Sequence, residues 1–198
     1  EVRLDCQPVR RNSSAPLLIV AERTSPEADL RAHPILRRSP TDVRSAPALW
    51  QPEYDRRQKV GNPLERDCDV GPMISDDAAE RAEAWIREAV AEGATLIEGG
   101  RREGRLVWPT VLTDTRPDMK VMCREAFAPL VSVVIYDDFD EALRLLGDSP
   151  YGLQAGIYTQ DLRKAFRAVA ALDDGGVLVN DASIFRVDHM PYGGNRMS

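Results

Sequence analysis

The feature that most constrains this chain is an alternation of short apolar runs and amphipathic helical stretches, which begins near Val60. "VSVVIY" (131–136) and "GVLVN" (176–180) are β-branched runs with the length of buried strands. Shorter strand candidates are "TLIEGG" (95–100), "RLVWPTVL" (105–112) and "LQAGIYT" (153–159). Strands that alternate with helices indicate an α/β domain, and we expect a largely parallel sheet flanked by helices.

Start and stop signals place the helices between these strands. In "SDDAAERAEAWIREAVAEG" (75–93), Ser75 is a candidate N-cap, two aspartates follow in the first turn, and Gly93 is a natural stop. Its predicted apolar stripe consists of Ala78, Ala82, Trp85, Ala89 and Val90. A second helix should begin after Asp138, because a glutamate three residues later completes a capping-box pattern, and should end at Gly147. A third helix is predicted over 161–176, with Leu162, Phe166, Val169 and Leu172 on one side.

Residues 1–59 differ from the rest of the chain. None of the 13 glycines lies there, yet the segment holds seven of the 14 prolines and ten arginines. Prolines at this frequency interrupt helices and interior strands, so "APLLIVAE" (15–22) is the one strand candidate. Two interpretations stay open: an irregular Arg/Pro-rich arm, or a non-native segment read out of frame. We expect residues 1–59 to pack poorly and to exchange amide hydrogens quickly.

Charge and cysteine content exclude several classes of function. A net charge of −6 and a pI near 5.1 argue against nucleic-acid or anionic-membrane partners, and no apolar run approaches the ~20 residues of a membrane span. Cys6, Cys68 and Cys123 are odd in number and widely spaced, which favours free thiols and a cytoplasmic protein. With His33 and His189 as the only histidines, we expect no metal site.

Seven blocks from residue 60 onward carry a resemblance to a known family. They are "VGNPLERDCDVGPMIS" (60–75), "EGATLIEGG" (92–100), "WPTVLTD" (108–114), "EAFAPLVSV" (125–133), "DEALRLLGDSPYGLQAGIYTQDL" (140–162), "GGVLVN" (175–180) and "PYGGNRMS" (191–198). In this order and with these gaps, residues 60–198 resemble the C-terminal part of the catalytic domain of the aldehyde dehydrogenase superfamily. No such match is found for residues 1–59.

The resemblance implies a chemistry and a cofactor site. In the family, a cysteine thiolate attacks an aldehyde, hydride passes to NAD or NADP, and water cleaves the thioester. The family's E-x-F-G-P block matches Glu125 and Phe127, which implies that Glu125 accepts hydrogen bonds from the nicotinamide ribose and Phe127 packs beside the nicotinamide. The alternative is an exposed loop glutamate beside a core phenylalanine. Ala128 stands where the family has glycine, and we expect its methyl group to disturb the loop.

The resemblance also implies a substrate site. Asn180 and Tyr192 match positions near the family's substrate tunnel, and Arg186 and His189 lie where selectivity loops occur. An arginine suits a carboxylate-, phosphonate- or sulfonate-bearing aldehyde, and the subgroup is similar to phosphonoacetaldehyde, sulfoacetaldehyde and lactaldehyde dehydrogenases. The alternatives are a strand-end role for Asn180, plain packing for Tyr192, and a surface pair of Arg186 with Asp188 beside a solvated His189.

No cysteine matches the family's nucleophile. The family places it roughly 35–40 residues before the V-G-N-P block, which corresponds here to "IVAERTS" (19–25), a stretch without cysteine. Cys6 lies 54 residues before Val60 (60 − 6 = 54), outside the motif, and Cys68 and Cys123 do not match it either. We therefore expect an incomplete catalytic domain that is inactive by itself, whose longer relatives form homo-oligomers. The competing hypotheses are a non-catalytic interaction module and a truncated or frameshifted remnant.

Overall fold

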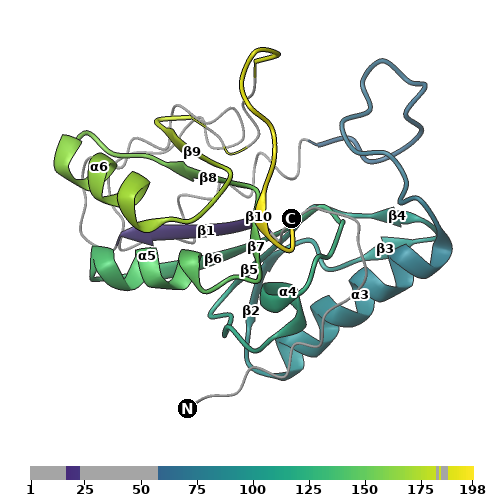
Figure 1. Cartoon of the computed structure of the whole chain (residues 1–198). Helices are drawn as coiled ribbons and strands as arrows, with labels where there is room; N and C mark the ends of the chain where they lie inside the picture. The colour runs from purple at the N-terminus through teal and green to yellow at the C-terminus, as the bar shows by residue number, and fades with distance from the viewer. Residues whose placement is uncertain (1–16, 23–57, 182, 184–186) are drawn as a thin grey trace. The chain divides into compact units, whose positions relative to one another are not determined.

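A computed structural model of the chain describes residues 17–22, 58–181, 183 and 187–198 (Figure 1). These residues fall into two compact units, which we call the N-unit (58–134) and the C-unit (the described residues from 135 onward). Strand β1 (Leu17–Glu22) contributes to both, which confirms a strand at the predicted place. The other expectations for residues 1–57 fall outside the described residues.

The N-unit opens with helix α3 (Asp76–Ala91), which begins and ends as predicted. The Ser75 hydroxyl accepts a hydrogen bond from the backbone N–H of Ala78 at 3.1 Å, and this satisfies one of the free donors of the first turn. After the last turn, Gly93 takes a left-handed conformation (φ 109°), and its N–H donates to the carbonyl of Val90.

The inward face of α3 is made almost wholly of small side chains. The buried residues are Ala78, Ala79, Ala82, Ile86 and Ala89. The predicted stripe is thus confirmed at its three alanines. It is wrong at Val90, which is 40% exposed, and Trp85 packs only at the edge of the core. Alanines let the helix lie close to the sheet, so Ile86 fills the remaining space.

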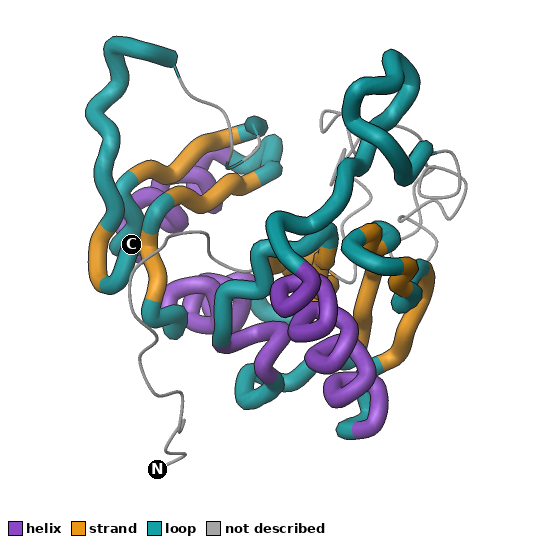
Figure 2. The backbone as a smooth tube through the Cα atoms, turned by 90° about the vertical axis from the view of Figure 1, so that its right-hand side faces the viewer, coloured by secondary structure: helices purple, strands orange, loops and turns teal. Residues whose placement is uncertain are grey.

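The N-unit sheet has the strand order β1-β6-β5-β2, with β2 (Thr95–Glu98), β5 (Thr110–Thr113) and β6 (Leu130–Tyr136). β5 and β6 pair in parallel and are connected through the short helix α4 (Lys120–Cys123). β2 pairs antiparallel with β5, and the intervening chain forms a hairpin of β3 (Arg102–Glu103) and β4 (Leu106–Val107). Figure 2 shows the same backbone with helices in purple and strands in orange.

The prediction of a largely parallel sheet is therefore wrong in part, since the sheets are small and mixed. The pairs β5–β6 and β8–β9 are parallel, whereas β2–β5, β3–β4 and β7–β10 are antiparallel. The physical reason for the first antiparallel pair is its connection. No helix separates β2 from β5, and an antiparallel pair needs no crossover.

Gly99 fixes the chain where β2 turns away from β5. Its φ is 80°, and a Cβ added there would overlap the carbonyl oxygen of Pro109. A side chain would therefore push the two strands apart at this point. The next N–H, that of Gly100, donates to the Thr110 hydroxyl at 2.9 Å, which ties the turn to the start of β5.

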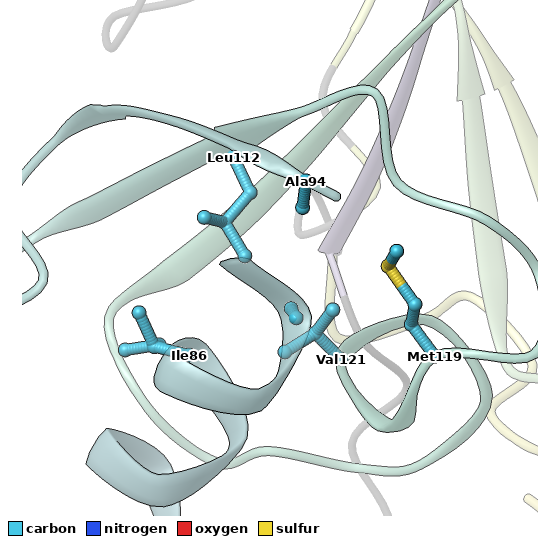
Figure 3. Packing of buried hydrophobic residues seen from close by; sticks show 6 residues of the cluster. Ile86, Ala94, Leu112, Met119 and Val121 are labelled. Atoms are coloured by element: carbon cyan, nitrogen blue, oxygen red, sulfur yellow. The ribbon is translucent and has the colours of Figure 1, made fainter. Parts of the chain in front are cut away.

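One core cluster joins α3, β5 and α4. It consists of Ile86, Ala89, Ala94, Leu112, Met119 and Val121, all at most 5% exposed. Figure 3 shows the Leu112 side chain directed from the strand toward Ile86 and Val121. Because α4 supplies Val121, this core also anchors the segment that follows α4.

The C-unit contains short strands around two helices. Its elements are α5 (Phe139–Gly147), β7 (Tyr151–Gly152), β8 (Gln154–Ile157), α6 (Leu162–Ala171), β9 (Gly176–Val179) and β10 (Asn195–Arg196). β8 and β9 pair in parallel, with α6 as the crossover, and β7 pairs antiparallel with β10. The Asp138 carboxylate accepts a hydrogen bond from the N–H of Glu141 at 2.9 Å, which confirms the predicted cap of α5.

Helix α6 packs through a different side from the one that its large apolar residues mark. Its buried residues are Ala165 and Ala168, followed by Leu172, and of these Ala168 and Leu172 pack with Leu143 and Ile157. The large side chains of the predicted stripe are mostly exposed: Leu162 at 69%, Phe166 at 68% and Val169 at 49%. The stripe is confirmed at Leu172 alone.

Candidate functional site

The segment Arg124–Phe127 follows α4 and precedes β6 in the N-unit. The Arg124 N–H still donates to the carbonyl of Lys120 at 3.0 Å, so the segment leaves a closed helical turn. The ammonium of Lys120 in turn lies 2.7 Å from the carboxylate of Glu88 on α3. On the other side, the carbonyl of Pro129 accepts from the N–H of Thr110 at 2.8 Å. The segment is thus held at both ends by the N-unit.

Between these anchors, three consecutive residues differ in burial. The Oε1 atom of Glu125 is fully buried, although the residue as a whole is only half-buried. Ala126 is 6% exposed, whereas the Phe127 side chain is 51% exposed. The backbone of Phe127 is left-handed, with φ 46°. A bulky residue in this region is strained, and such strain is common at ligand-binding positions.

The methyl group of Ala128, which we expected to disturb the loop, is not pushed out of the core. Ala128 packs against the cluster formed by α3 residues, Met73 and Val107, so its methyl group is accommodated by the core. The left-handed conformation falls one residue earlier, at Phe127.

Asn180 ends β9 in the C-unit and also has a left-handed backbone, with φ 59°. Its side-chain oxygen accepts a hydrogen bond from the N–H of Thr159 at 2.9 Å, and its own N–H donates to the carbonyl of Ile157 at 2.7 Å. Asn180 therefore bridges the carboxyl ends of β8 and β9. Its strand-end role is present in the structure, at the edge of a parallel pair where ligands commonly bind.

The other predicted substrate residues are exposed or fall outside the described residues. Arg186 is not among the described residues, so its pairing with Asp188 is untested. His189 is exposed, and Tyr192 is 62% exposed, so Tyr192 is not a core residue of the C-unit. A turn in which the Met190 N–H donates to the carbonyl of Val187 precedes the exposed segment 191–193.

Arg196 anchors this segment from its C-terminal side; it lies in the block "PYGGNRMS" (191–198), but the sequence predicted no role for it. Its guanidinium donates to the carbonyls of Gly147 (2.6 Å), Ser149 (2.9 Å) and Asp173 (3.1 Å) and to the carboxylate of Asp174 (2.8 Å). One side chain thereby ties β10 to the ends of two helices. Sequence reasoning missed it because three of the four acceptors are backbone carbonyls, which no residue type encodes.

Three described carboxylates have a shifted pKa: that of Asp67 is lowered by a hydrogen bond from Lys59, and those of Asp174 and Glu83 belong to contacts between elements. Burial raises the pKa of Asp174 above its ordinary 3.8, and the opposing attraction of Arg196 does not cancel this. A hydrogen bond from Arg102 lowers the pKa of Glu83 below its ordinary 4.5. The Nε atom of Arg102 lies 2.8 Å from the Glu83 carboxylate, which attaches the β3–β4 hairpin to α3. Both are structural contacts and not a catalytic pair.

The structure therefore divides the predicted site residues between the two units. Glu125 and Phe127 belong to the N-unit, and Asn180, His189 and Tyr192 belong to the C-unit. The described cysteines lie in the N-unit and are thiols: Cys68, whose sulfur is 3.4 Å from the carbonyl of Val70, and Cys123 at the end of α4.

The fold is that of a mixed α/β fragment, and comparison with known proteins identifies its family. The model of the aldehyde dehydrogenase family matches residues 53–198, and the chain belongs to that family. It is 50% identical over 146 residues to a 3-sulfolactaldehyde dehydrogenase of Priestia aryabhattai, covering 74% of this chain and 31% of that protein.

Two solved structures give the same assignment. Aldehyde dehydrogenase 21 of Physcomitrella patens, in complex with the reaction product succinate, is 43% identical, with a TM-score of 0.71 over 73% of this chain and 30% of that one. A glyceraldehyde-3-phosphate dehydrogenase of Methanocaldococcus jannaschii complexed with NADP is 29% identical, with a TM-score of 0.77 over 93% of this chain and 43% of that one. The chain thus spans about a third of the curated relatives' length. No helix in its described part is long and apolar enough to cross a membrane.

Proposed function

We propose that this chain supplies the C-terminal part of the catalytic domain of an NAD(P)-dependent dehydrogenase that oxidises a small anionic aldehyde to the acid. The observation that carries the proposal is the turn Glu125–Phe127. It presents a 51% exposed aromatic ring on a left-handed backbone, directly after a buried alanine and a glutamate with one buried carboxylate oxygen. A fold that kept this strained turn only for packing would bury the ring.

The residues of this turn fit the nicotinamide half of the cofactor. A half-buried carboxylate whose chain is anchored on both sides is suited to accept hydrogen bonds from ribose hydroxyls, and an exposed phenyl ring offers an apolar surface to a nicotinamide. When bound, NAD or NADP supplies the acceptor for the hydride that leaves the substrate. Glu125 would orient that acceptor, and Phe127 would cover one side of it and limit the access of water.

For the substrate, we propose contacts from Asn180, Arg186, His189 and Tyr192. Exposed His189 precedes the segment 191–193 that Arg196 anchors, exposed Tyr192 lies in that segment, and Asn180 lies at the carboxyl edge of β8 and β9. The name of one relative contains a sulfonate-bearing aldehyde, and another structure holds the dicarboxylate succinate. An arginine forks onto either kind of oxyanion, so Arg186 would select an anionic aldehyde.

By itself, the chain should not oxidise aldehydes. None of Cys6, Cys68 and Cys123 has the spacing of the family's nucleophile, and a ribose contact is worth on the order of 1–3 kcal/mol, too little to hold the cofactor tightly. We expect no NADH or NADPH formation above background with sulfo-, phosphono- and carboxy-substituted or neutral aldehydes. Turnover that disappears on Cys6→Ser would show that the spacing argument is wrong.

The role of Glu125 is tested in a longer product that contains the upstream part of the catalytic domain. There, Glu125→Gln should slow the single-turnover hydride step by about tenfold or more, with a much smaller change in aldehyde binding, because misalignment acts on the transferring atom. Glu103→Gln, an exposed glutamate on the β3–β4 hairpin, is the matched control and should leave both unchanged. Equal effects of the two substitutions would overturn the assignment of Glu125.

A further inference from the structure

The segment 191–193 is attached to the C-unit at two points, and the first is a close backbone approach at Gly175. This glycine directly precedes β9, and its N–H donates to the carbonyl of Gly152 at 2.9 Å. A Cβ added at Gly175 would lie 1.8 Å from the carbonyl oxygen of Gly193, so one of the two backbones would have to move. Gly175 is not among the glycines with positive φ. It therefore lacks a side chain for the sake of this approach and not of its backbone conformation.

The second point of attachment is Arg196, three residues after Gly193. Its side chain is only 24% exposed, because the guanidinium binds the four acceptors described above and lies over Gly152, where an added Cβ would meet it at 2.6 Å. The backbone of Arg196 is left-handed, with φ 59°, and a bulky residue keeps this conformation only where its surroundings compensate for the strain. The pairing of β10 with β7 holds the same stretch of backbone (Figure 1).

This double attachment does not bury apolar surface of the segment. Pro191, Tyr192 and Gly193 are all exposed, and Tyr192 is 62% exposed. An arginine held in one geometry loses rotamer freedom, and a left-handed backbone is strained. A segment that is fixed at such a cost, without apolar burial in return, is fixed for the groups that it presents.

We infer that Gly175 and Arg196 are positioning residues of the proposed aldehyde site, an inference that rests on the proposed function. Gly175 sets the distance of Gly193 from the start of β9, and Arg196 fixes the backbone on the far side of the PYGG glycines. Together they hold the backbone of Tyr192 in one place, and neither has to touch the aldehyde. A displacement of about 1 Å in a substrate contact can cost on the order of 100-fold in rate. The proposed cofactor contacts lie in the N-unit, so substitutions at these two positions should act on the aldehyde and not on the cofactor.

Hydrogen exchange in the 198-residue chain tests the attachment itself. The Met197 N–H donates to the carbonyl of Pro150 at 3.0 Å, and Gly175→Ala should speed exchange in peptides that cover 191–198 by about tenfold or more. The matched control is Gly176→Ala, because an added Cβ there would lie 3.6 Å from the Gln154 side chain, which is an ordinary contact. Equal exchange in the two variants would overturn the inference, since the close approach at Gly175 would then fix nothing.

Kinetics of the longer product that tests Glu125 show whether the attachment serves the aldehyde. Gly175→Ala and Arg196→Met should each raise the KM of an anionic aldehyde by about tenfold or more and leave the KM of NAD(P) within about twofold. Arg196→Lys should recover only part of the loss, because a compact ammonium does not reach four acceptors as the planar guanidinium does. The controls are Gly176→Ala and Arg167→Met, which removes an exposed ion pair with Asp140, and they should change neither KM.

The outcomes separate this inference from the proposed function. Circular dichroism identifies variants that fail to fold, and if Arg196→Met is one of them, the milder Arg196→Lys decides by the same two KM values. A parental product that oxidises anionic aldehydes, with both KM values raised equally or not at all in the variants, would overturn the inference and leave the proposed function intact. A folded parental product that oxidises no aldehyde would instead refute the proposed function, and the positioning role with it.

Discussion

At Phe127, a functional role and a packing role predict clearly different losses of stability on substitution. Its ring is 51% exposed, and its backbone has φ 46°. Replacing a fully buried phenylalanine by alanine costs about 3–5 kcal/mol. A half-exposed ring at the surface leaves no closed cavity, so Phe127→Ala should lower the free energy of unfolding by only about 1 kcal/mol.

The left-handed backbone at Phe127 leads to a second prediction, in which the usual order of stability of alanine and glycine variants is reversed. Glycine relieves about 1–2 kcal/mol of strain at such a position and loses about 0.5–1 kcal/mol through the greater freedom of the unfolded chain. Phe127→Gly should therefore be more stable than Phe127→Ala by roughly 0.5–1 kcal/mol. Ala126→Gly is the control one residue earlier: Ala126 is buried and outside the left-handed region, so glycine there should cost about 1 kcal/mol.

Urea unfolding followed by tryptophan fluorescence and circular dichroism measures all three variants against the parent chain. A loss above about 3 kcal/mol for Phe127→Ala would mean that the ring belongs to the core, and the cofactor role would lose its main support. A glycine variant less stable than the alanine variant would contradict the left-handed conformation.

Two further outcomes follow from the packing and from the carboxylates. Leu112→Ala should lower the free energy of unfolding by about 2–5 kcal/mol because Leu112 is 0% exposed. Leu162→Ala, at a residue that is 69% exposed, should change it by less than about 0.5 kcal/mol. Comparable losses in the two variants would contradict the core assignment. Arg102 lowers the pKa of Glu83, so Glu83 contributes stability that is lost as the pH falls below 4.5. In unfolding measured from about pH 3 to pH 7, Glu83→Gln should therefore reduce the loss of stability at acid pH. Burial raises the pKa of Asp174, so its contribution to the free energy of unfolding changes with pH in the opposite direction. That contribution decreases as the pH rises from 3.8 through the folded pKa, and Asp174→Asn should remove the decrease. Unchanged pH profiles in the two variants would contradict both predictions.

Local signals in the sequence were sufficient for most helix ends and strands. Ser75 and Asp138 cap their helices as predicted, because a capping side chain acts on backbone groups within three residues. Strand direction was not predictable in this way. The antiparallel pairing of β2 with β5 depends on the path between them, and periodicity carries no information about it. Helix α4, with four residues, is too short to show a period.

The misassigned face of α6 has a different physical cause. Because Phe166 and Leu162 have larger apolar side chains than Ala165 and Ala168, the sequence predicted the larger pair to be buried. The alanines are buried instead, because a crossover helix must lie close to a narrow two-stranded sheet. A pattern of apolar residues does not distinguish a side that packs within the unit from one that packs elsewhere.

The candidate site residues were accessible to sequence reasoning only through the family blocks, and the structure gives those of the N-unit and those of the C-unit different supports. The Glu125–Phe127 turn is held by Lys120 on Glu88 and by the Pro129 carbonyl, all within the N-unit. Asn180 depends on its hydrogen bond to Thr159 and hence on the β8–β9 pair, and the segment with Tyr192 depends on Arg196. A substitution that loosens one of these supports should therefore leave the residues of the other unit folded. Defects in the proposed cofactor role and in the proposed substrate role can then be separated by where the support lies, even for residues that touch neither ligand.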